Sequence, residues 1–163
     1  MSTSTADLYD KSLSDGALVQ VTEGHFLAFG RRRAFSGPIR TLKVHEDNAL
    51  VRGALEERGE GCVLVIDGGG SLRAALLGDQ LATLAMKNRW AGIVVWGAIR
   101  DSVAIDALDV GVRCLATTPR RSEKRGFGER DVAVSFAGVR FAPGAHLYAD
   151  LDGILVSSAP LSP

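Results

Sequence analysis

The sequence contains few of the residues that build specialised sites. It has two cysteines, three histidines and five prolines among 163 residues, and aromatic residues make up 6%. Cys62 and Cys114 lie far apart in apolar, β-like segments and outside any Cys-x-x-Cys pattern, which predicts reduced core residues. The histidines, His25, His45 and His146, lack the close spacing typical of zinc ligands, which argues against a Cys/His metal centre.

Net charge is also missing. Nineteen Lys and Arg balance nineteen Asp and Glu, and the isoelectric point is near 6.8. A neutral chain has no broad basic surface for nucleic acid or anionic membranes, so any anionic ligand needs a local site. No apolar run reaches the roughly 18 residues of a membrane span, and the first residues lack the basic and apolar parts of a signal peptide. We therefore expect a soluble, cytoplasmic protein with neither nucleic acid nor membrane as a partner.

The length and composition suit one domain. A chain of 163 residues with 46% hydrophobic and 23% charged residues can bury a sizeable core, and no linker or repeat divides it. We therefore expect a single domain over residues 1–163. Glycine is abundant, with 19 copies, or roughly 12% against about 7% on average. This excess predicts many tight turns and close backbone contacts.

Apolar periodicity predicts alternating strands and helices. The runs 62–67 and 92–99 are continuously apolar, as in strands buried on both faces, and a helix over 79–88 between them predicts a parallel crossover. An amphipathic helix over 5–14 comes first, with Thr5 as its cap and with Leu8 and Leu13 on one side. Further strands are expected within 17–21, 25–30, 39–45, 72–77 and 113–117, further helices within 46–61 and 102–108, a basic loop over 119–130, and hairpin strands over 132–158.

A glycine cluster, Asp67-Gly68-Gly69-Gly70, follows the first buried run. Glycines let backbone amides approach a ligand, and an acid after a strand can bind a ribose, so a phosphate loop or a methyltransferase site is one interpretation. The cluster lacks the Lys-Ser/Thr of a P-loop and the spacing of a dinucleotide fingerprint. The simpler interpretation is a tight turn that leaves a buried strand, and a third is a turn that lines a small-molecule pocket.

A second pattern is the spacing of twenty residues between Asp79 and the pair Arg100-Asp101. A helix of about ten residues carries the chain roughly 15 Å away, and a strand of about six returns it roughly 20 Å. These residues should therefore meet at the carboxyl edge of a sheet, where ligand crevices form, beside the free amides that begin the helix. The plain alternative is that Asp79 caps its helix while Arg100 pairs with an acid on the rim.

Stretches along nearly the whole chain resemble the RraA-like family. They are TADLYD, FSGPIRTLKV, GSLRAALLGDQLATLAMKNRWAGIVVWGAIRD, TTPRRSEKRGFGE, FAGVRFAPG and LYADLDGILV, in the order and spacing of the family. The resemblance implies an α/β fold, a single-domain β/β/α sandwich of the swivelling phosphohistidine-domain-like type. The family includes class II 4-hydroxy-4-methyl-2-oxoglutarate aldolases and the regulator of ribonuclease E activity. Its metal-dependent aldolase branch has the pattern Asp, twenty residues, Arg-Asp.

The resemblance also implies a role for each residue of this pattern. Asp101 ligates a divalent metal, and a single carboxylate completed by water and substrate oxygens suits Mg²⁺ or Mn²⁺. Arg100 binds a carboxylate of the substrate or steadies an enolate oxygen. Asp79 holds metal-bound water and helps to shuttle a proton. The backbone amides of Gly78, Asp79, Gln80 and Leu81 receive the carboxylate of a small 2-oxo acid.

The activity implied by the resemblance is cleavage of 4-hydroxy-4-methyl-2-oxoglutarate to two pyruvates. Decarboxylation of oxaloacetate passes through the same pyruvate enolate and is expected as a second activity. Similar proteins form trimeric rings with sites at subunit interfaces, so we expect a homotrimer, with pairing into hexamers left open. The alternative within the family is a non-catalytic regulator that binds and inhibits ribonuclease E.

Other sequence features favour either a different enzyme class or a purely structural role. A class I aldolase needs a lysine of lowered pKa in a dry pocket, and Lys43, on a strand, is the sole candidate. A quinone-type methyltransferase would bind S-adenosylmethionine at the glycine cluster. The remaining assignments are solvated surface for the basic runs 31–33 and 120–130, packing for Trp90 and Trp96, and turn formation for Asp150 and Asp152.

Overall fold

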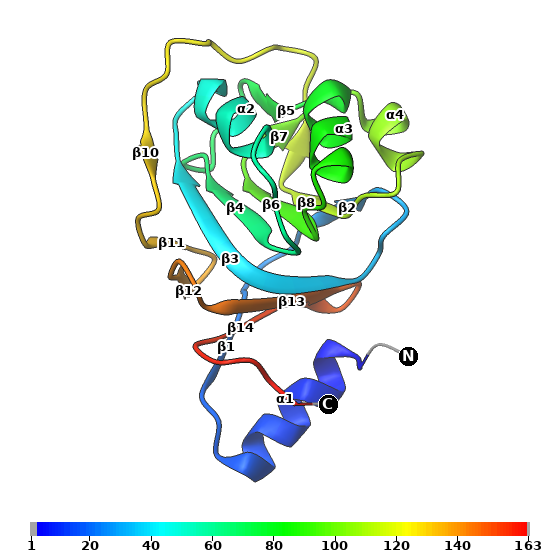
Figure 1. The fold of residues 1–163 in the computed structure, drawn as a ribbon, viewed down its shortest axis with the longest axis vertical. Coiled ribbons are helices and arrows are strands. Elements are labelled where there is room, and N and C mark those ends of the chain that lie inside the picture. Colours follow the sequence, from blue (N-terminus) through cyan, green and yellow to red (C-terminus); the bar gives the residue numbers. More distant parts are fainter. Residues whose placement is uncertain (1–2, 163) are drawn as a thin grey trace.

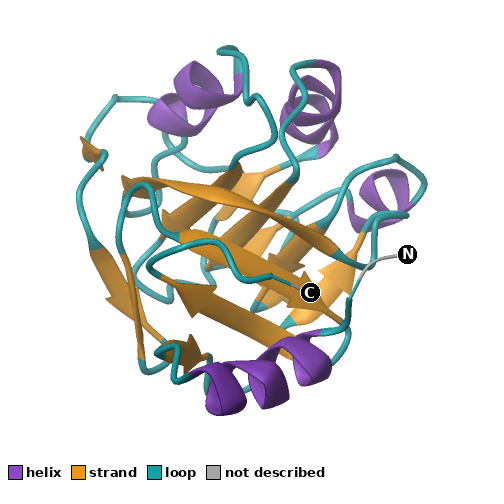
Figure 2. Ribbon diagram, turned by 60° about the horizontal axis from the view of Figure 1, so that its bottom comes forward, coloured by secondary structure: helices purple, strands orange, loops and turns teal. Residues whose placement is uncertain are grey.

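The computed structural model describes residues 3–162 as a mixed α/β fold with a large curled sheet and few helices (Figure 1; Figure 2). The predicted fold class is therefore confirmed. The helices are α1 (Thr5–Asp15), α2 (Ala49–Leu55), α3 (Asp79–Lys87) and α4 (Ser102–Asp106). The strands are β1 (Val19–Val21), β2 (Leu27–Phe29), β3 (Phe35–Lys43), β4 (Val63–Asp67), β5 (Ala75–Leu77), β6 (Gly92–Trp96), β7 (Ala98–Ile99), β8 (Val112–Cys114), β9 (Ala116–Thr117), β10 (Glu129–Arg130), β11 (Val134–Phe136), β12 (Val139–Phe141), β13 (His146–Asp150) and β14 (Gly153–Ser157). None of the helices within residues 3–162 is long and apolar enough to cross a membrane.

The large sheet has a parallel centre and antiparallel flanks. Strands β3, β4, β6 and β8 are parallel neighbours, with Ile39 opposite Val63 and Val63 opposite Gly92. Strands β13, β14 and β1 continue one flank in antiparallel pairing, β2 pairs with β8 on the other flank, and β10 pairs with β3. The first four residues of β4 are buried, as predicted for a strand that is covered on both faces.

A smaller parallel sheet consists of the short strands β5, β7 and β9. Strands β5, β7 and β9 follow β4, β6 and β8 respectively, so the chain passes three times from the large sheet into the small one. The runs predicted as single strands over 92–99 and 113–117 are therefore two strands each, divided at Gly97 and Leu115. The apolar pattern does not reveal the division because both sheets bury their strands.

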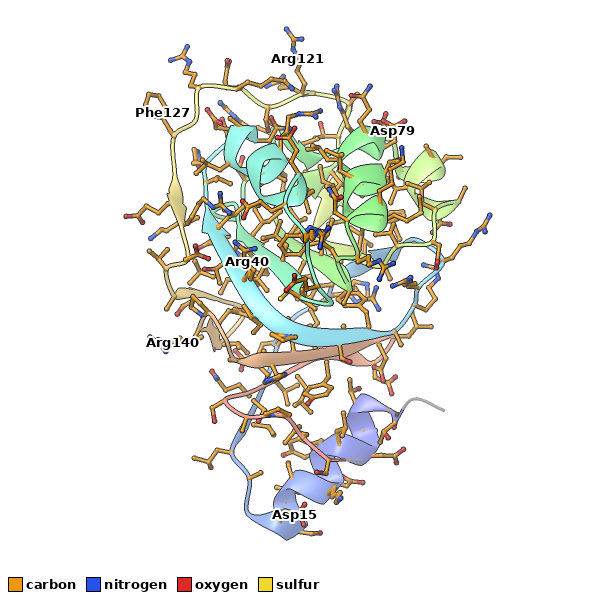
Figure 3. All side chains as sticks on the ribbon, in the orientation of Figure 1. Asp15, Arg40, Asp79, Arg121, Phe127 and Arg140 are labelled. Atoms are coloured by element: carbon orange, nitrogen blue, oxygen red, sulfur yellow. The ribbon has the colours of Figure 1, made fainter. Side chains whose placement is uncertain are left out.

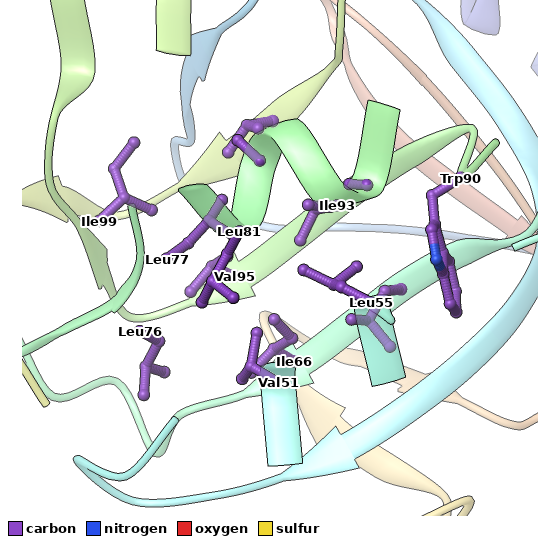
Figure 4. Packing of buried hydrophobic residues seen from close by; sticks show 14 of the residues in the cluster. Val51, Leu55, Ile66, Leu76, Leu77, Leu81, Trp90, Ile93, Val95 and Ile99 are labelled. Atoms are coloured by element: carbon purple, nitrogen blue, oxygen red, sulfur yellow. The ribbon is translucent and has the colours of Figure 1, made fainter. Parts of the chain in front are cut away.

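The core occupies both faces of the large sheet. On one face, Val51 and Leu55 of α2 and Leu81 of α3 pack with Ile66 and Val95 of the sheet (Figure 4). Full burial of one such side chain contributes about 1.5–3 kcal/mol relative to its exposure to water. This face therefore fixes the two helices whose ends form the site described below.

The opposite face of the sheet is packed mainly by aliphatic residues, with a group of stacked aromatic rings among them. Trp96 stacks on Phe136 with ring centroids 4.9 Å apart, and Phe136 stacks on Phe141 at 4.4 Å. Trp90 is buried at the margin of the helical core, where its indole N–H donates to the Glu57 carbonyl at 3.1 Å. The packing role predicted for both tryptophans is confirmed.

Helix α1 lies against β13 and β14, away from the other helices (Figure 1). Its N-cap is Ser4, whose hydroxyl accepts from the Asp7 N–H at 3.0 Å. The predicted cap, Thr5, is wrong because its N–H and hydroxyl both donate to the Asp150 carboxylate, at 2.8 and 2.7 Å. Asp150 also accepts from the Asp152 N–H at 2.9 Å, which confirms its predicted role in the turn. Its bonds to Thr5 give it a second role, because they dock α1 against β13.

Two helix predictions need further correction. On α1, Leu8 is buried as predicted, but Leu13 is 66% exposed and the buried position next to it belongs to Ser12. Helix α2 occupies only Ala49–Leu55 of the predicted range 46–61. The residues before it turn instead, because the Ala49 N–H donates to the Asp47 carboxylate at 3.1 Å.

Candidate active site

A cleft of about 340 Å³ opens between helix α2 and the N-terminal end of α3. Every residue of the predicted site lines it, namely Gly78, Asp79, Gln80, Leu81, Arg100 and Asp101. The other walls come from α2 and from residues 121 and 124 of the basic loop. Figure 3 shows Asp79 and Arg121 at the end of the molecule that carries α2 and α3.

The small sheet brings the two halves of the sequence pattern together. Strands β5 and β7 are parallel, with Leu77 paired to Ile99, so both deliver their next residues to the same edge. The Arg100 N–H donates to the Leu77 carbonyl at 2.9 Å. The juxtaposition of Asp79 with Arg100 and Asp101 is thus confirmed, although the sheet edge belongs to β5 and β7 and not to the large sheet.

Asp101 faces the first turn of α3. It has a left-handed backbone, with φ of +58°, which Asp and Asn tolerate better than most residues. Its Oδ2 atom accepts from the Asp79 N–H at 3.2 Å. A Cβ atom at position 78 would lie 2.9 Å from the same Oδ2, so a larger residue there would displace the carboxylate from this position.

The start of α3 offers backbone donors to the cleft. The cap residue is Gly78, and the first bond of the helix runs from the Ala82 N–H to the Gly78 carbonyl at 3.0 Å. The N–H groups of Gln80 and Leu81 precede that bond and therefore have no partner within the helix. Together with the helix dipole, these donors favour an anion at this end of the cleft.

The plain alternative for the two charged residues is wrong. Asp79 does not cap its helix, because Gly78 occupies the cap position and makes no side-chain bond there. Among residues 3–162, no side-chain hydrogen bond or ion pair engages the Arg100 guanidinium. A half-buried arginine fork without a carboxylate partner, next to free amides, is suited to bind one from a ligand.

The donor set fits a hard divalent cation that keeps most of its water. Within the described residues no group of three His, Cys, Asp or Glu side chains could hold a metal ion. Asp101 is exposed in the cleft and uses one oxygen for a single N–H group, which leaves the other oxygen for a ligand. Mg²⁺ is commonly bound through one or two carboxylates, water and substrate oxygens, whereas structural zinc requires a full protein donor set.

The basic loop forms a fixed wall of the cleft. Residues 120–126, here called the strap, are attached on one side to β5, where the Ser122 hydroxyl donates to the Ala75 carbonyl at 2.7 Å. On the other side the N–H groups of Arg125 and Gly126 donate to the Asp47 carboxylate, at 2.7 and 3.2 Å. The charged residues of the strap are exposed, as predicted for solvated surface, but the strap is also attached to the fold at both ends and lines the cleft, which the prediction did not include.

Asp47 is the anchor of the strap, and the sequence interpretation missed it. Its side chain is 3% exposed and accepts hydrogen bonds from both sides of the cleft. Burial acts to raise the pKa of this carboxyl, but the hydrogen bonds outweigh burial and leave the pKa below its ordinary value. The donors are the backbone N–H groups of Ala49, Arg125, Gly126 and Phe127.

Comparison with known proteins assigns the chain. A family model described as "RraA-like: Aldolase/RraA" matches residues 5–156. The chain belongs to the RraA-like family. A relative from Dechloromonas aromatica, named "Putative 4-hydroxy-4-methyl-2-oxoglutarate aldolase", is 55% identical over 99% of this chain and 100% of its own length.

Solved structures of RraA-like relatives share the fold under other names. The "RNA-processing inhibitor RraA from Thermus thermophilis" superposes with a TM-score of 0.93 and 47% identity, covering 99% of this chain and 96% of that chain. An "S-adenosylmethionine: 2-dimethylmenaquinone methyltransferase" from Geobacillus kaustophilus gives 0.91 and 49%, covering 98% and 97%. One fold thus carries three functional names, so function has to be argued from the site.

The glycine cluster of this RraA-like chain is a tight turn. The N–H groups of Gly68 and Gly70 both donate to the Trp96 carbonyl, at 3.1 and 3.2 Å, and Gly69 donates to Asp67 at 2.9 Å. A Cβ atom on Gly68 would lie 2.8 Å from that carbonyl oxygen. The amides that a phosphate or cofactor would need are therefore occupied, and the cluster lies outside the cleft.

The remaining candidate residues lie outside the cleft or are unsuited to covalent chemistry. Lys43 is exposed at the end of β3, so it lacks the dry pocket of a Schiff-base lysine. Cys114 is buried, and burial raises the pKa of its thiol to about 12, whereas Cys62 is only half-buried. In the run 31–33, Arg32 forms an exposed ion pair with Asp109 at 3.1 Å.

Proposed function

We propose that this RraA-like chain is a divalent-metal-dependent class II aldolase that cleaves 4-hydroxy-4-methyl-2-oxoglutarate into two pyruvates. The curated relatives carry the name of this aldolase at about 55% identity. The observation that carries the proposal is the meeting of Arg100 and Asp101 with the first turn of α3 in one cleft. An unpaired arginine and backbone donors are groups that bind a 2-oxo acid, and the free carboxylate oxygen would hold the divalent cation.

The 2-oxo acid end of the substrate binds at the start of α3. Its carboxylate accepts from the N–H groups of Gln80 and Leu81, while Gly78 leaves room for the close approach. Arg100 donates to the 2-oxo oxygen or to the same carboxylate. This arrangement holds the C3–C4 bond of the substrate over the open part of the cleft.

The reaction breaks the C3–C4 bond. The C4 hydroxyl loses its proton and becomes the carbonyl of the first pyruvate, and the bonding electrons move to the C3 side as the enolate of the second. Asp79, at the rim of the cleft, takes part in moving that proton, which finally reaches C3. Arg100 stabilises the negative charge that develops on the enolate oxygen.

Asp101 is the residue that would hold the cation, Mg²⁺ or Mn²⁺ by its donor chemistry. When bound, such an ion supplies Lewis acidity at the 2-oxo and carboxylate oxygens. Decarboxylation of oxaloacetate needs the same stabilisation, because loss of CO₂ from C4 also leaves the pyruvate enolate. We therefore include oxaloacetate decarboxylation in the proposed activity.

The experiment is a pyruvate-release assay. Purified protein is incubated with Mg²⁺ or Mn²⁺ and either substrate, and pyruvate is measured by its reduction with lactate dehydrogenase and NADH. We expect release of pyruvate that EDTA abolishes and excess metal restores. The absence of pyruvate from both substrates with both metals would overturn the proposal.

A second candidate is a non-catalytic regulator that binds and inhibits ribonuclease E. It is favoured by the close structural similarity to the RNA-processing inhibitor RraA. A pull-down against the C-terminal region of the nuclease, combined with an RNA-cleavage assay, separates the two candidates. Binding with inhibition, unaffected by EDTA and by substitution of Asp101, would support the regulator.

The proposal includes a homotrimer, as the family resemblance implies, with pairing into hexamers left open, and a cytoplasmic location, as expected from the sequence. Large apolar side chains are exposed on α1 and around β1, including Leu13 at 66% and Leu18 at 90%. Exposed apolar patches of this kind are typical of protein interfaces. Size-exclusion chromatography with light scattering measures the oligomeric mass, and a monomer at micromolar concentration would refute this part.

A further inference from the structure

The cleft holds more positive charge than the proposed chemistry uses. Among the described residues that line it, Arg52, Arg121 and Lys124 accompany Arg100. No side-chain ion pair within residues 3–162 engages any of these four groups. The acids of the lining are Glu56, Asp79 and Asp101, so the four basic groups exceed them by one, and a cation held by Asp101 would enlarge this excess.

Some arginines elsewhere on the surface are neutralised by acids. Arg40 and Arg130 both pair with Glu57, at 3.5 and 2.6 Å, and Arg73 pairs with Glu46 at 2.9 Å. By contrast Arg52 and Arg121 line a common cleft together with Glu56, and no ion pair within residues 3–162 joins either arginine to that carboxylate. Arginines without an ion pair also occur outside the cleft, as at Arg58, so the distinguishing feature of Arg52 and Arg121 is that both line the same cleft as Arg100.

The backbone of Arg121 is held in place by the strap. Arg121 forms an isolated parallel β-bridge with Ala75, and the Ala75 N–H donates to the Arg120 carbonyl at 2.8 Å. The neighbouring Ser122 is 5% exposed and bonded to the same residue of β5. The strap therefore fixes the backbone of Arg121 at the rim of the cleft, and the exposed side chain extends from there (Figure 3).

Arg52 approaches from the opposite wall. Its neighbours on α2, Val51, Ala54 and Leu55, are buried in the core, so the helix is fixed in rotation and leaves Arg52 on its solvent side. That side borders the cleft. Two guanidinium groups thus come from two separate, well-anchored elements.

We propose that Arg52 and Arg121 bind the second carboxylate of the substrate and thereby select dicarboxylic 2-oxo acids. The inference rests on the proposed aldolase function, in which Arg100 and the amides of α3 take the first carboxylate. Guanidinium groups suit this task because their planar fork matches a carboxylate in two-point fashion. Both proposed substrates carry such a group at the end remote from the 2-oxo acid.

The test compares two substrates that differ in the second carboxylate. One is 4-hydroxy-4-methyl-2-oxoglutarate, and the other is 4-hydroxy-2-oxopentanoate, which has no charge at that end. We expect Arg52→Met and Arg121→Met to lower kcat/KM for the first substrate about 10- to 100-fold, mainly through KM. The same variants should leave kcat/KM for the second substrate within about twofold, because its cleavage does not use these arginines.

Oxaloacetate provides a further prediction from the same contacts. Its second carboxylate loses its charge as CO₂ departs, so arginines that hold it stabilise the ground state more than the transition state. The variants should therefore raise KM for oxaloacetate without lowering kcat. A purely structural role for the arginines would lower kcat for all substrates together.

Controls separate failure of the inference from failure of the proposed function. Arg58→Met removes an exposed arginine outside the cleft and should change no substrate ratio. Deuterium exchange at the methyl group of pyruvate, followed by NMR, reports on enolate formation without any second carboxylate and should persist in each variant. Arg52→Gln and Arg121→Gln repeat the test with a polar replacement.

The outcomes are distinct. If the unmodified protein neither cleaves any substrate nor exchanges pyruvate, the proposed function fails. If it is active but the variants lower kcat/KM for both hydroxy acids equally, or for neither, the function stands and the selection by Arg52 and Arg121 is refuted.

Discussion

The two long walls of the cleft are built in different ways. One wall consists of Gly78 to Leu81 and Arg100-Asp101, and it is formed where two parallel strands of the small sheet end. The other wall includes the strap, which has no strand of its own within residues 120–126 and depends on side-chain anchors. The first wall is a product of sheet geometry, and the second depends on individual hydrogen bonds.

Two aspartates show what this difference means chemically. Asp47 is 3% exposed and accepts from several backbone N–H groups, so its oxygens are committed to the fold. Asp101 is exposed and accepts from a single N–H at 3.2 Å, so one oxygen stays available. A carboxylate with its acceptor positions filled serves structure, whereas one with an open position can serve a ligand.

The largest expected effect comes from removing the open carboxylate charge. Asp101→Asn keeps the shape, the left-handed backbone preference and an acceptor for the Asp79 N–H. It removes the anion that would hold the cation, so pyruvate release should fall about 1,000-fold, or roughly 4 kcal/mol. The free energy of unfolding should change by less than about 0.5 kcal/mol, measured by urea titration.

The matched control is Asp109→Asn, which removes an exposed acid that pairs with Arg32 outside the cleft. It should preserve activity. Near-normal turnover in Asp101→Asn, with titration calorimetry showing unchanged binding of Mn²⁺, would exclude Asp101 as the metal ligand.

The next effect comes from filling the space beside that carboxylate. In Gly78→Ala the new Cβ would lie 2.9 Å from Asp101 Oδ2 and 3.6 Å from the Arg100 side chain. The backbone at position 78 is extended, with φ of −128°, so alanine adds no backbone strain. We expect about a 100-fold loss of activity, equal to roughly 2.7 kcal/mol, with little loss of stability.

Gly53→Ala serves as the comparison, because a Cβ there meets nothing within 4 Å although residue 53 also lines the cleft. It should retain activity, since alanine is a better helix former than glycine. Equal activity in the two alanine variants would show that close packing at residue 78 is unimportant.

The same contrast explains how far the sequence could predict the site. The meeting of Asp79 with Arg100 and Asp101 was predictable, because the rise of a helix and a strand fixes where the chain returns. The division of the run 92–99 into β6 and β7 was not, because burial in two different sheets leaves the same apolar pattern.

The strap could not be foreseen for a different reason. Its anchor joins Arg125 to Asp47 across 78 residues of sequence. A backbone N–H carries no residue identity, so its pairing with a distant carboxylate leaves no periodicity to detect. In the sequence, Arg121 is therefore part of an ordinary charged run, and only the fold shows that it lines the cleft.

A smaller effect is expected from breaking the strap anchor. Asp47→Asn retains one acceptor but loses the charge that several N–H groups share, and it introduces donors next to them. Loss of charge-assisted hydrogen bonds should lower the free energy of unfolding by about 1–3 kcal/mol. Activity with the dicarboxylic substrate should fall through KM, because the strap that carries Arg121 then keeps only its attachment to β5.

Glu57→Gln provides the comparison for this stability measurement. It weakens the exposed ion pairs with Arg40 and Arg130 and should cost less than about 1 kcal/mol. If Glu57→Gln lowers the free energy of unfolding more than Asp47→Asn does, the strap is held by contacts other than those of Asp47.

The smallest expected effect is a pH dependence of the same anchor. The folded-state pKa of Asp47 lies below its ordinary value, so the protonated form is disfavoured in the native protein. Its contribution to stability is therefore complete above the unfolded pKa of about 3.9 and is lost as the pH falls through the lower folded pKa. The stability difference between the unmodified protein and Asp47→Asn should be constant from pH 7 to about 5 and narrow below about 4, in urea titrations at each pH.

Because the Asp150 carboxylate that docks α1 also has a lowered pKa, its protonation should still destabilise the variant in acid. The free energy of unfolding of the variant should thus still fall below about pH 4, but less steeply than that of the unmodified protein. An equally steep fall in both proteins would mean that the charge of Asp47 does not help to hold the strap.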